Sequence, residues 1–125
     1  MDWTFSGDTP IYTQLMDKFK LSIVSGELAP GEKLSAVREL AVKVGVNPNT
    51  MQRALSELER IGLVYSQRTS GRYVTEDLSV IERTKKEIAD ARLRDFLSNM
   101  SFLGYTKDGI ISLIMESEDM TDGNT

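Results

Sequence analysis

A short polar segment carries the side chains best suited to chemistry in this sequence. Asn47, Asn49, Thr50, Gln52 and Arg53 follow directly after a glycine-containing turn. Asn and Gln can form paired hydrogen bonds with adenine, Arg can bind guanine or phosphate, and Thr offers a hydroxyl and a methyl to thymine. The segment therefore predicts contacts with DNA bases, although each residue taken alone fits a helix cap or a solvated helix face equally well.

The composition excludes most catalytic and metal-binding chemistry. The 125 residues include no cysteine and no histidine, which removes a disulfide framework, a thiolate zinc site, a cysteine nucleophile and the commonest general base. The sequence also has no paired catalytic acids, glycine-rich phosphate loop or nucleophile motif. We therefore expect no enzymatic activity, no cofactor and no metal site.

The hydropathy of the chain favours a cytoplasmic protein. The sequence does not open with a basic region followed by an apolar run, and no stretch approaches the roughly 18 apolar residues of a membrane span. The length favours one domain, with room for an element that folds only against a partner. We expect no contact with a membrane.

Charge is segregated along the chain. The formal net charge is −4, which argues against a protein that coats polyanions in general. Between Ser35 and Thr75, however, the net charge is +3, while the remainder carries −7. This distribution suits one face that binds an anion, although ordinary sampling would also produce it.

Three amphipathic helices should position the polar segment. The first is expected to run from Thr9-Pro10 to Gly26, where a hydroxyl cap and a proline fit the start and a glycine fits the end. The second should start at a Ser35 cap and the third at an Asn47 cap, with only a tight turn between them. This spacing is typical of a helix-turn-helix, in which the start of the second helix of the motif enters the major groove.

A β-hairpin is predicted directly after the third helix. Residues 63–66 and 73–75 favour strands, and the polar segment 67–72 between them contains a glycine. A hairpin at this place makes the helix-turn-helix a winged one, and we expect Arg68 and Arg72 to contact phosphates from it rather than remain merely solvated. The predicted fold is mainly α with a small β-hairpin, followed by two C-terminal helices.

The C-terminal helices have an apolar side that they cannot bury alone. A long polar helix should begin at Ser79 and a last helix at Thr106, and an acidic tail follows Glu116. The apolar residues must pack on the first part of the chain or on a second chain, and the sequence favours a homodimer. The predicted dimer contacts are Ile81, Ile88, Phe96, Leu97, Met100, Leu103, Ile110 and Ile114.

These elements predict a DNA-binding domain over residues 1–77, a helical dimerisation region over 78–118 and a flexible acidic tail over 119–125. A ligand pocket in the C-terminal helices is a less favoured alternative to a dimer core, and a small-molecule effector stays undetermined. The residues that would line such a pocket are Phe96, Met100, Phe102, Tyr105 and Met115.

Four ordered sequence runs resemble the GntR-type bacterial transcription regulators. The runs are Pro10-Ile11-Tyr12-x-Gln14, Gly26-x-Leu28-x-Pro30-Gly31-x-x-Leu34, Val37-Arg38-Glu39-Leu40-Ala41 and Val46-Asn47-Pro48-Asn49-Thr50. The short C-terminal part is similar to that of the YtrA subfamily. The resemblance implies a winged-helix repressor that dimerises through its C-terminal helices and binds a palindromic operator, often one that controls transporter genes.

The resemblance also implies roles for single residues. Arg38 matches the family's phosphate or base contact, and Asn47, Asn49, Thr50 and Gln52 match the reading end, with Arg53 beside it. Two motifs differ from the family pattern. The wing keeps Arg68 and Gly71 but has Thr69 where the first wing glycine is usual, and the usual Pro-Ser before the second helix is Ser35-Ala36, which shifts the hydroxyl that would contact phosphate.

The residues and the resemblance together predict a homodimeric, sequence-specific DNA-binding regulator whose partner is a palindromic operator in double-stranded DNA. The main alternative is a winged-helix module that binds another protein and no DNA. The net charge of −4 and the altered wing favour this alternative modestly.

Overall fold

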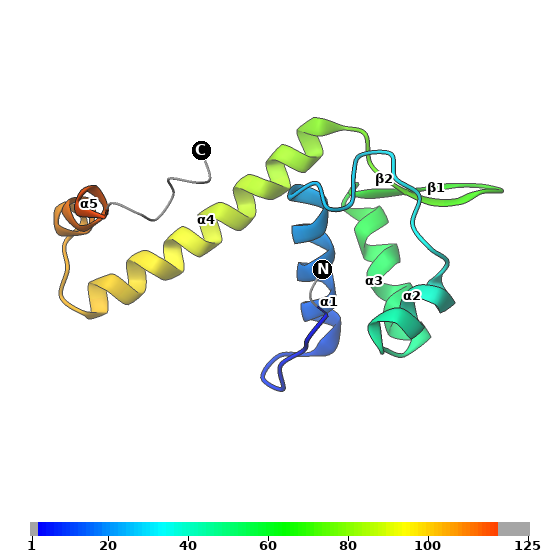
Figure 1. The fold of residues 1–125 in the computed structure, drawn as a ribbon, viewed down its shortest axis with the longest axis horizontal. Coiled ribbons are helices and arrows are strands. Elements are labelled where there is room, and N and C mark those ends of the chain that lie inside the picture. The colour runs from blue at the N-terminus through cyan, green and yellow to red at the C-terminus, as the bar shows by residue number, and fades with distance from the viewer. Residues whose placement is uncertain (1–2, 118–125) are drawn as a thin grey trace. The chain divides into compact units, whose positions relative to one another are not determined.

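The computed structural model describes residues 3–117, and the predicted tail at 119–125 lies outside them. The chain divides within a long helix, after Lys86, into two compact units. The described part is mainly helical with one antiparallel two-stranded hairpin, which confirms the predicted fold class (Figure 1). In chain order the elements are α1 (Ile11–Val24), α2 (Val37–Val44), α3 (Pro48–Arg60), β1 (Val64–Gln67), β2 (Gly71–Val74), α4 (Leu78–Phe102) and α5 (Lys107–Glu116).

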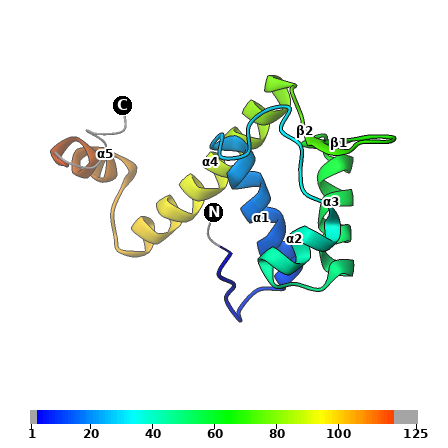
Figure 2. The same ribbon diagram turned by 45° about the vertical axis from the view of Figure 1, so that its right-hand side comes forward.

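The first unit is built on α1, α2 and α3, which bring their apolar stripes together. Figure 2 shows the three helices grouped on one side of the hairpin. Leu15 and Phe19 of α1 and Met51, Leu55 and Leu58 of α3 are almost fully buried. Trp3 and Phe5 pack against this core, with the Trp3 ring edge-on to Phe19 at 5.3 Å between centroids.

Among the first three helices, the start of α3 agrees with the sequence prediction and the starts of α1 and α2 differ from it. Asn47 caps α3, since its Oδ1 accepts a hydrogen bond of 2.7 Å from the Asn49 N–H, and Pro48 fills the first helical position. The N-caps of α1 and α2 are Pro10 and Ala36, neither with a side-chain hydrogen bond, so the predicted Ser35 cap is wrong.

At α1, the predicted Thr9 cap is likewise replaced, because the side chain of Gln14 holds the preceding segment. Its amide nitrogen donates to the Thr9 and Ser6 carbonyls at 2.6 and 2.9 Å, and its Oε1 accepts from the Ser6 N–H at 2.7 Å. A side chain one turn inside the helix therefore fixes the chain that enters it.

The hairpin pairs Val64 with Val74 and Gln67 with Gly71, which leaves a three-residue turn at 68–70. The segment before α2 joins it, because Lys33 bridges to Tyr73 and the Leu34 N–H donates to the Arg72 carbonyl at 2.9 Å. The chain before α2 is thus fixed to the wing on one side and to the helix-turn-helix on the other.

The first turns of α4 belong to the first unit. Ile81 and Thr84 are buried, and Ile81 is part of the core formed by the three helices and the hairpin. Asp77 holds the helix start, since its Oδ1 accepts hydrogen bonds from both the N–H and the hydroxyl of Ser79, at 3.0 and 2.6 Å. Ser79 is therefore not the cap that the sequence predicted. The predicted boundary at residue 77 falls where α4 begins, whereas the unit continues to Lys86.

The second unit contains the rest of α4 and α5. Gly104, with a φ of +97°, turns the chain between the two helices, and Thr106 caps α5 by accepting a hydrogen bond of 3.1 Å from the Gly109 N–H, as predicted. Ile110 is buried within this unit, while most of its other large apolar side chains are exposed. No helix among residues 3–117 is long and apolar enough to cross a membrane.

Candidate nucleic-acid interface

The start of α3 presents a polar face outward. The core residues of this helix occupy one side, and Asn49, Gln52 and Arg53 lie exposed on the other, with Thr50 half-buried between them. Asn47 uses its side-chain oxygen in the cap, which leaves its amide N–H groups as donors. The structure thus brings together all five residues that the sequence selected at this helix end.

Two of these side chains have partners within the protein. Gln52 Nε2 donates to Ser56 Oγ one turn along α3 at 3.1 Å. The Arg53 guanidinium lies over the ring of Tyr12, with its Cζ 4.0 Å from the ring centroid. Periodicity indicates only a packing role for Tyr12, because its place on the apolar stripe of α1 says nothing about what lies on neighbouring α3.

The two wing arginines differ in position. Arg68 lies exposed in the turn, whereas Arg72 is only 20% exposed and its Nε donates to Glu59 Oε1 of α3 at 2.7 Å. Side chains alternate along a strand, so Arg72 shares the inward side with buried Val74. Arg72 is thus paired within the protein, and its predicted phosphate contact stays a prediction.

The pKa values of two acids on α3 follow from such pairs. The hydrogen bond from Arg72 lowers the pKa of the Glu59 carboxyl below its usual value, with a smaller contribution from Ser66. In the same way Arg60, whose Nε donates to both Glu57 oxygens at 2.8 and 2.9 Å, lowers the pKa of Glu57. Both carboxylates therefore stay ionised and hydrogen-bonded to arginine.

An open groove of about 570 Å³ runs between the start of α2 and the hairpin. Ser35 is half-buried in its wall, and Arg38 is exposed on the first turn of α2. Gly71 has a φ of +118°, and a Cβ there would lie 3.3 Å from the Cε of Lys33. The groove is lined by Lys33, Leu34, Ser35, Ala36, Val37, Glu39, Ser70, Gly71 and Arg72.

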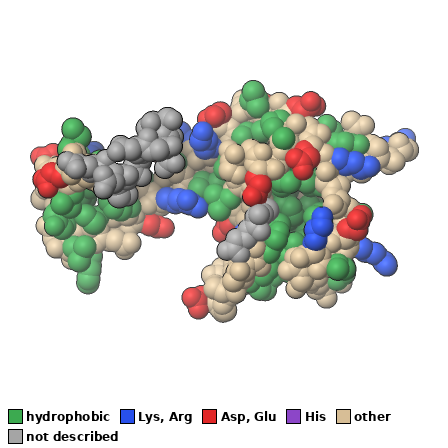
Figure 3. All heavy atoms as spheres, in the orientation of Figure 1, with side chains coloured by type: hydrophobic (Ala, Val, Ile, Leu, Met, Phe, Trp, Pro, Cys, Tyr) green, Lys and Arg blue, Asp and Glu red, His purple; other side chains and the backbone are tan. Residues whose placement is uncertain are grey.

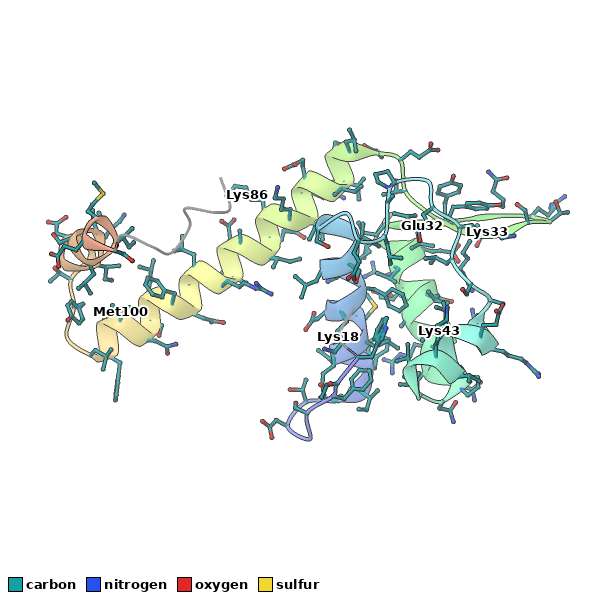
Figure 4. All side chains as sticks on the ribbon, in the orientation of Figure 1. Lys18, Glu32, Lys33, Lys43, Lys86 and Met100 are labelled. Carbon is teal, nitrogen blue, oxygen red and sulfur yellow. The ribbon has the colours of Figure 1, made fainter. Side chains whose placement is uncertain are left out.

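Lys33 is a cation of this surface that the sequence reasoning missed. It lies on the segment beside the hairpin, while Lys43 lies on α2 (Figure 4). The available signal was a basic residue two positions before the expected Ser35 cap, but its place beside the wing depends on the bridge to Tyr73, which local sequence does not reveal.

The predicted dimer contacts fall into two groups. Ile81 is in the core of the first unit, which corrects its prediction as an interface residue, because a side chain packed there is not available to a second chain. The other seven lie in the second unit. There Ile110 is 4% exposed within one chain, while Phe96, Leu103 and Ile114 are 42%, 69% and 57% exposed.

Figure 3 shows apolar side chains on the surface of α5 and the end of α4. Figure 4 places Met100, another of the seven, on this last part of α4. Within residues 3–117, no cluster of three or more carboxylates is placed to hold a metal ion.

A helix-turn-helix followed directly by a β-hairpin defines a winged-helix protein. Residues 11–74 match the family described as bacterial regulatory proteins, gntR family. The chain is 39% identical to the uncharacterized HTH-type transcriptional regulator YhcF of Bacillus subtilis, over 89% of this chain and 92% of that protein. It is 32% identical to the HTH-type transcriptional repressor YtrA of the same organism, over 92% and 90% of the two chains. The protein belongs to the GntR family.

Solved structures agree with this assignment. A GntR family transcriptional regulator from Listeria monocytogenes has 42% sequence identity and a TM-score of 0.82, covering 91% of this chain and all of that one. The DNA-binding domain of AraR in complex with operator ORX1 has 28% identity and a TM-score of 0.53, covering 58% of this chain and 93% of that one. The relatives are transcription regulators rather than enzymes, which confirms the prediction that this chain is not an enzyme.

Proposed function

We propose that this GntR-family regulator is a cytoplasmic repressor that binds a palindromic DNA operator as a homodimer. The observation that carries the proposal is the exposed polar start of α3, in a helix that is followed by a wing with an exposed arginine in its turn. In a winged helix this end of the helix enters the major groove. The related AraR domain, which is similar in fold and sequence, is described in complex with operator DNA.

Base reading and phosphate binding are assigned to different residues. Asn49, Thr50 and Gln52 are the proposed base readers, with the amide of Asn47 at their edge, because their donors and acceptors suit base edges. Arg38 and Arg68 are the proposed phosphate contacts, since both are exposed arginines, one on the first turn of α2 and one in the turn of the wing. Ser35 and Gly71 line the groove between α2 and the wing, where the DNA backbone would approach.

The second unit supports the homodimer. Phe102, Leu103 and Met115 are 92%, 69% and 79% exposed in a single chain, and burial of such side chains between two copies would remove apolar surface from water. A twofold dimer would place two recognition helices about one DNA turn apart, ~34–36 Å, and would require an inverted repeat. Transporter genes are the targets that the resemblance to the YtrA subfamily favours.

In vitro selection of double-stranded DNA from a random pool, at physiological salt, tests the proposal. We expect an inverted repeat with a fixed half-site spacing. On that repeat, Asn49→Ala or Gln52→Ala should weaken specific binding by ~1–3 kcal/mol and leave binding to unrelated DNA nearly unchanged. Equal losses on both DNAs would refute base reading, and no enrichment would favour a module that binds protein instead.

The oligomeric state tests the assembly separately. Ile114→Asp places a charge on the proposed interface and should give monomers in sedimentation at micromolar concentration. Val42→Asp is the matched control, because Val42 is an apolar residue of α2 that is 83% exposed in the first unit. A wild-type protein that is monomeric at this concentration would contradict the homodimer.

A further inference from the structure

The contact between Arg53 and Tyr12 connects the recognition helix to a helix outside the helix-turn-helix. Tyr12 lies in the first turn of α1, half-buried against the core, and Arg53 is exposed on α3 beside Gln52. The guanidinium carbon lies 4.0 Å from the ring centroid, within the range of a cation–π contact. The core thus fixes the position of the Tyr12 ring, and the ring in turn restricts the Arg53 side chain.

A position over the Tyr12 ring can leave the hydrogen-bonding groups of this arginine available. A guanidinium carries its five N–H donors in its plane, so a contact through its face does not occupy them. The ring restricts a long side chain that would otherwise lose rotamer freedom when it binds. An arginine held in this way is ready to donate to a planar or tetrahedral anion at the edge of the reading face.

The acid one turn further along α3 has another partner. Glu57 accepts hydrogen bonds from Arg60 on both oxygens, while Arg53 affects it only as a nearby positive charge. Glu57 therefore already has an arginine that satisfies its carboxylate, and Arg53 is oriented by the tyrosine ring.

We propose that Tyr12 is a positioning residue for DNA binding, which holds Arg53 flat so that its N–H groups contact a backbone phosphate beside the base-reading residues. The DNA interface then includes the start of α1 as well as α2, α3 and the wing. This inference rests on the proposed function and adds a residue whose own side chain need not touch DNA.

A double-mutant cycle on the selected operator tests the proposal. Tyr12→Leu removes the ring and should weaken binding by about two- to fivefold for each half-site. In an Arg53→Ala background the same change should have no further effect, because the group that the ring positions is gone. Arg53→Ala itself should reduce the magnitude of the salt slope by ~0.9 for each phosphate that the protein no longer neutralises.

Conservative variants separate positioning from folding. Tyr12→Phe keeps the ring and should restore binding, and Arg53→Lys keeps the charge but loses the planar fork, so binding should fall. If urea unfolding shows that Tyr12→Leu is not folded, Arg53→Lys still decides, because an affinity equal to that of the wild type overturns the proposal.

Three further outcomes would overturn the inference. They are losses that add in the double variant, an unchanged salt slope in Arg53→Ala, and a Tyr12→Phe variant as weak as Tyr12→Leu, which would assign the effect to the hydroxyl. A wild-type protein that retains no DNA at any salt concentration would instead refute the proposed function itself.

Discussion

The two wing arginines should affect different properties when each is replaced by alanine, one the stability of the fold and the other the salt dependence of DNA binding. Arg72 is 20% exposed and donates to Glu59, which is 30% exposed, at 2.7 Å. Arg68 lies in the exposed turn four residues earlier. Arg72→Ala should therefore lower the free energy of unfolding with little change in the salt dependence of DNA binding. Arg68→Ala should reduce the salt dependence of DNA binding with little change in the free energy of unfolding.

The magnitudes follow from exposure and charge. A hydrogen bond between charged groups contributes ~1.5–3 kcal/mol when buried, while exposed ion pairs contribute ~0.2–1 kcal/mol. The Arg72–Glu59 pair is intermediate in exposure, so Arg72→Ala should cost about 1 kcal/mol of stability. For Arg68→Ala the salt slope should fall in magnitude by ~0.9 per phosphate, or ~1.8 for a dimer with both wings bound.

Two measurements on each variant distinguish a stabilising arginine from one that contacts a phosphate. Urea unfolding at one fixed protein concentration gives stability, since the stability of a dimer depends on concentration. Affinity for the selected operator at several salt concentrations gives the slope. If Arg72→Ala lowers the slope as much as Arg68→Ala does, the pair with Glu59 opens on DNA, and the reasoning from strand alternation is refuted.

Three further predictions concern single contacts. Asn47→Ala removes the α3 cap and should cost ~1 kcal/mol in urea unfolding, whereas Asn47→Asp, which keeps the acceptor, should cost much less. Gly71→Ala should lower the free energy of unfolding by ~1–3 kcal/mol because of the positive φ at this position. Adding Lys33→Ala should relieve only the crowding between the new Cβ and the Lys33 side chain, so a full recovery of stability in the double variant would contradict backbone strain. Because the pKa of Glu59 is lowered, its ionised carboxylate stabilises the fold at pH values above the usual pKa of 4.5, and this stabilisation is lost as the pH falls through the folded-state pKa. In urea unfolding between pH 3 and 6, the free energy of unfolding should therefore depend less on pH in Glu59→Gln than in the wild type. An unchanged pH dependence would contradict the pair of Glu59 with Arg72.

Features set by local chemistry could be predicted from the sequence. Asn47 and Pro48 determine the start of α3, because an acceptor side chain and a residue without an N–H satisfy the first turn without distant contacts. The Thr106 cap of α5 has the same local origin. The polar face of α3 follows as well, since 3.6 residues per turn place the apolar positions of this helix on the opposite side.

Features set by distant partners could not be predicted. The pair between Arg72 and Glu59 requires the hairpin register and its position over α3, and the place of Lys33 requires a bridge across the chain. The spacing of Ile81 suits any apolar helix face and so predicts a contact with a second chain, yet the core that covers this side chain comes from the first unit. Periodicity identifies a buried side but not what buries it.

The pairing of acids on α3 explains how a chain with a net charge of −4 can carry a DNA-binding surface. Glu57 and Glu59 lie on the helix proposed to enter the major groove, where unpaired carboxylates would repel phosphates. Arg60 pairs with Glu57 and Arg72 with Glu59, so α3 would meet DNA without an uncompensated acid. The net charge of the whole protein is then a poor guide to binding, because DNA would encounter the local charge balance along α3.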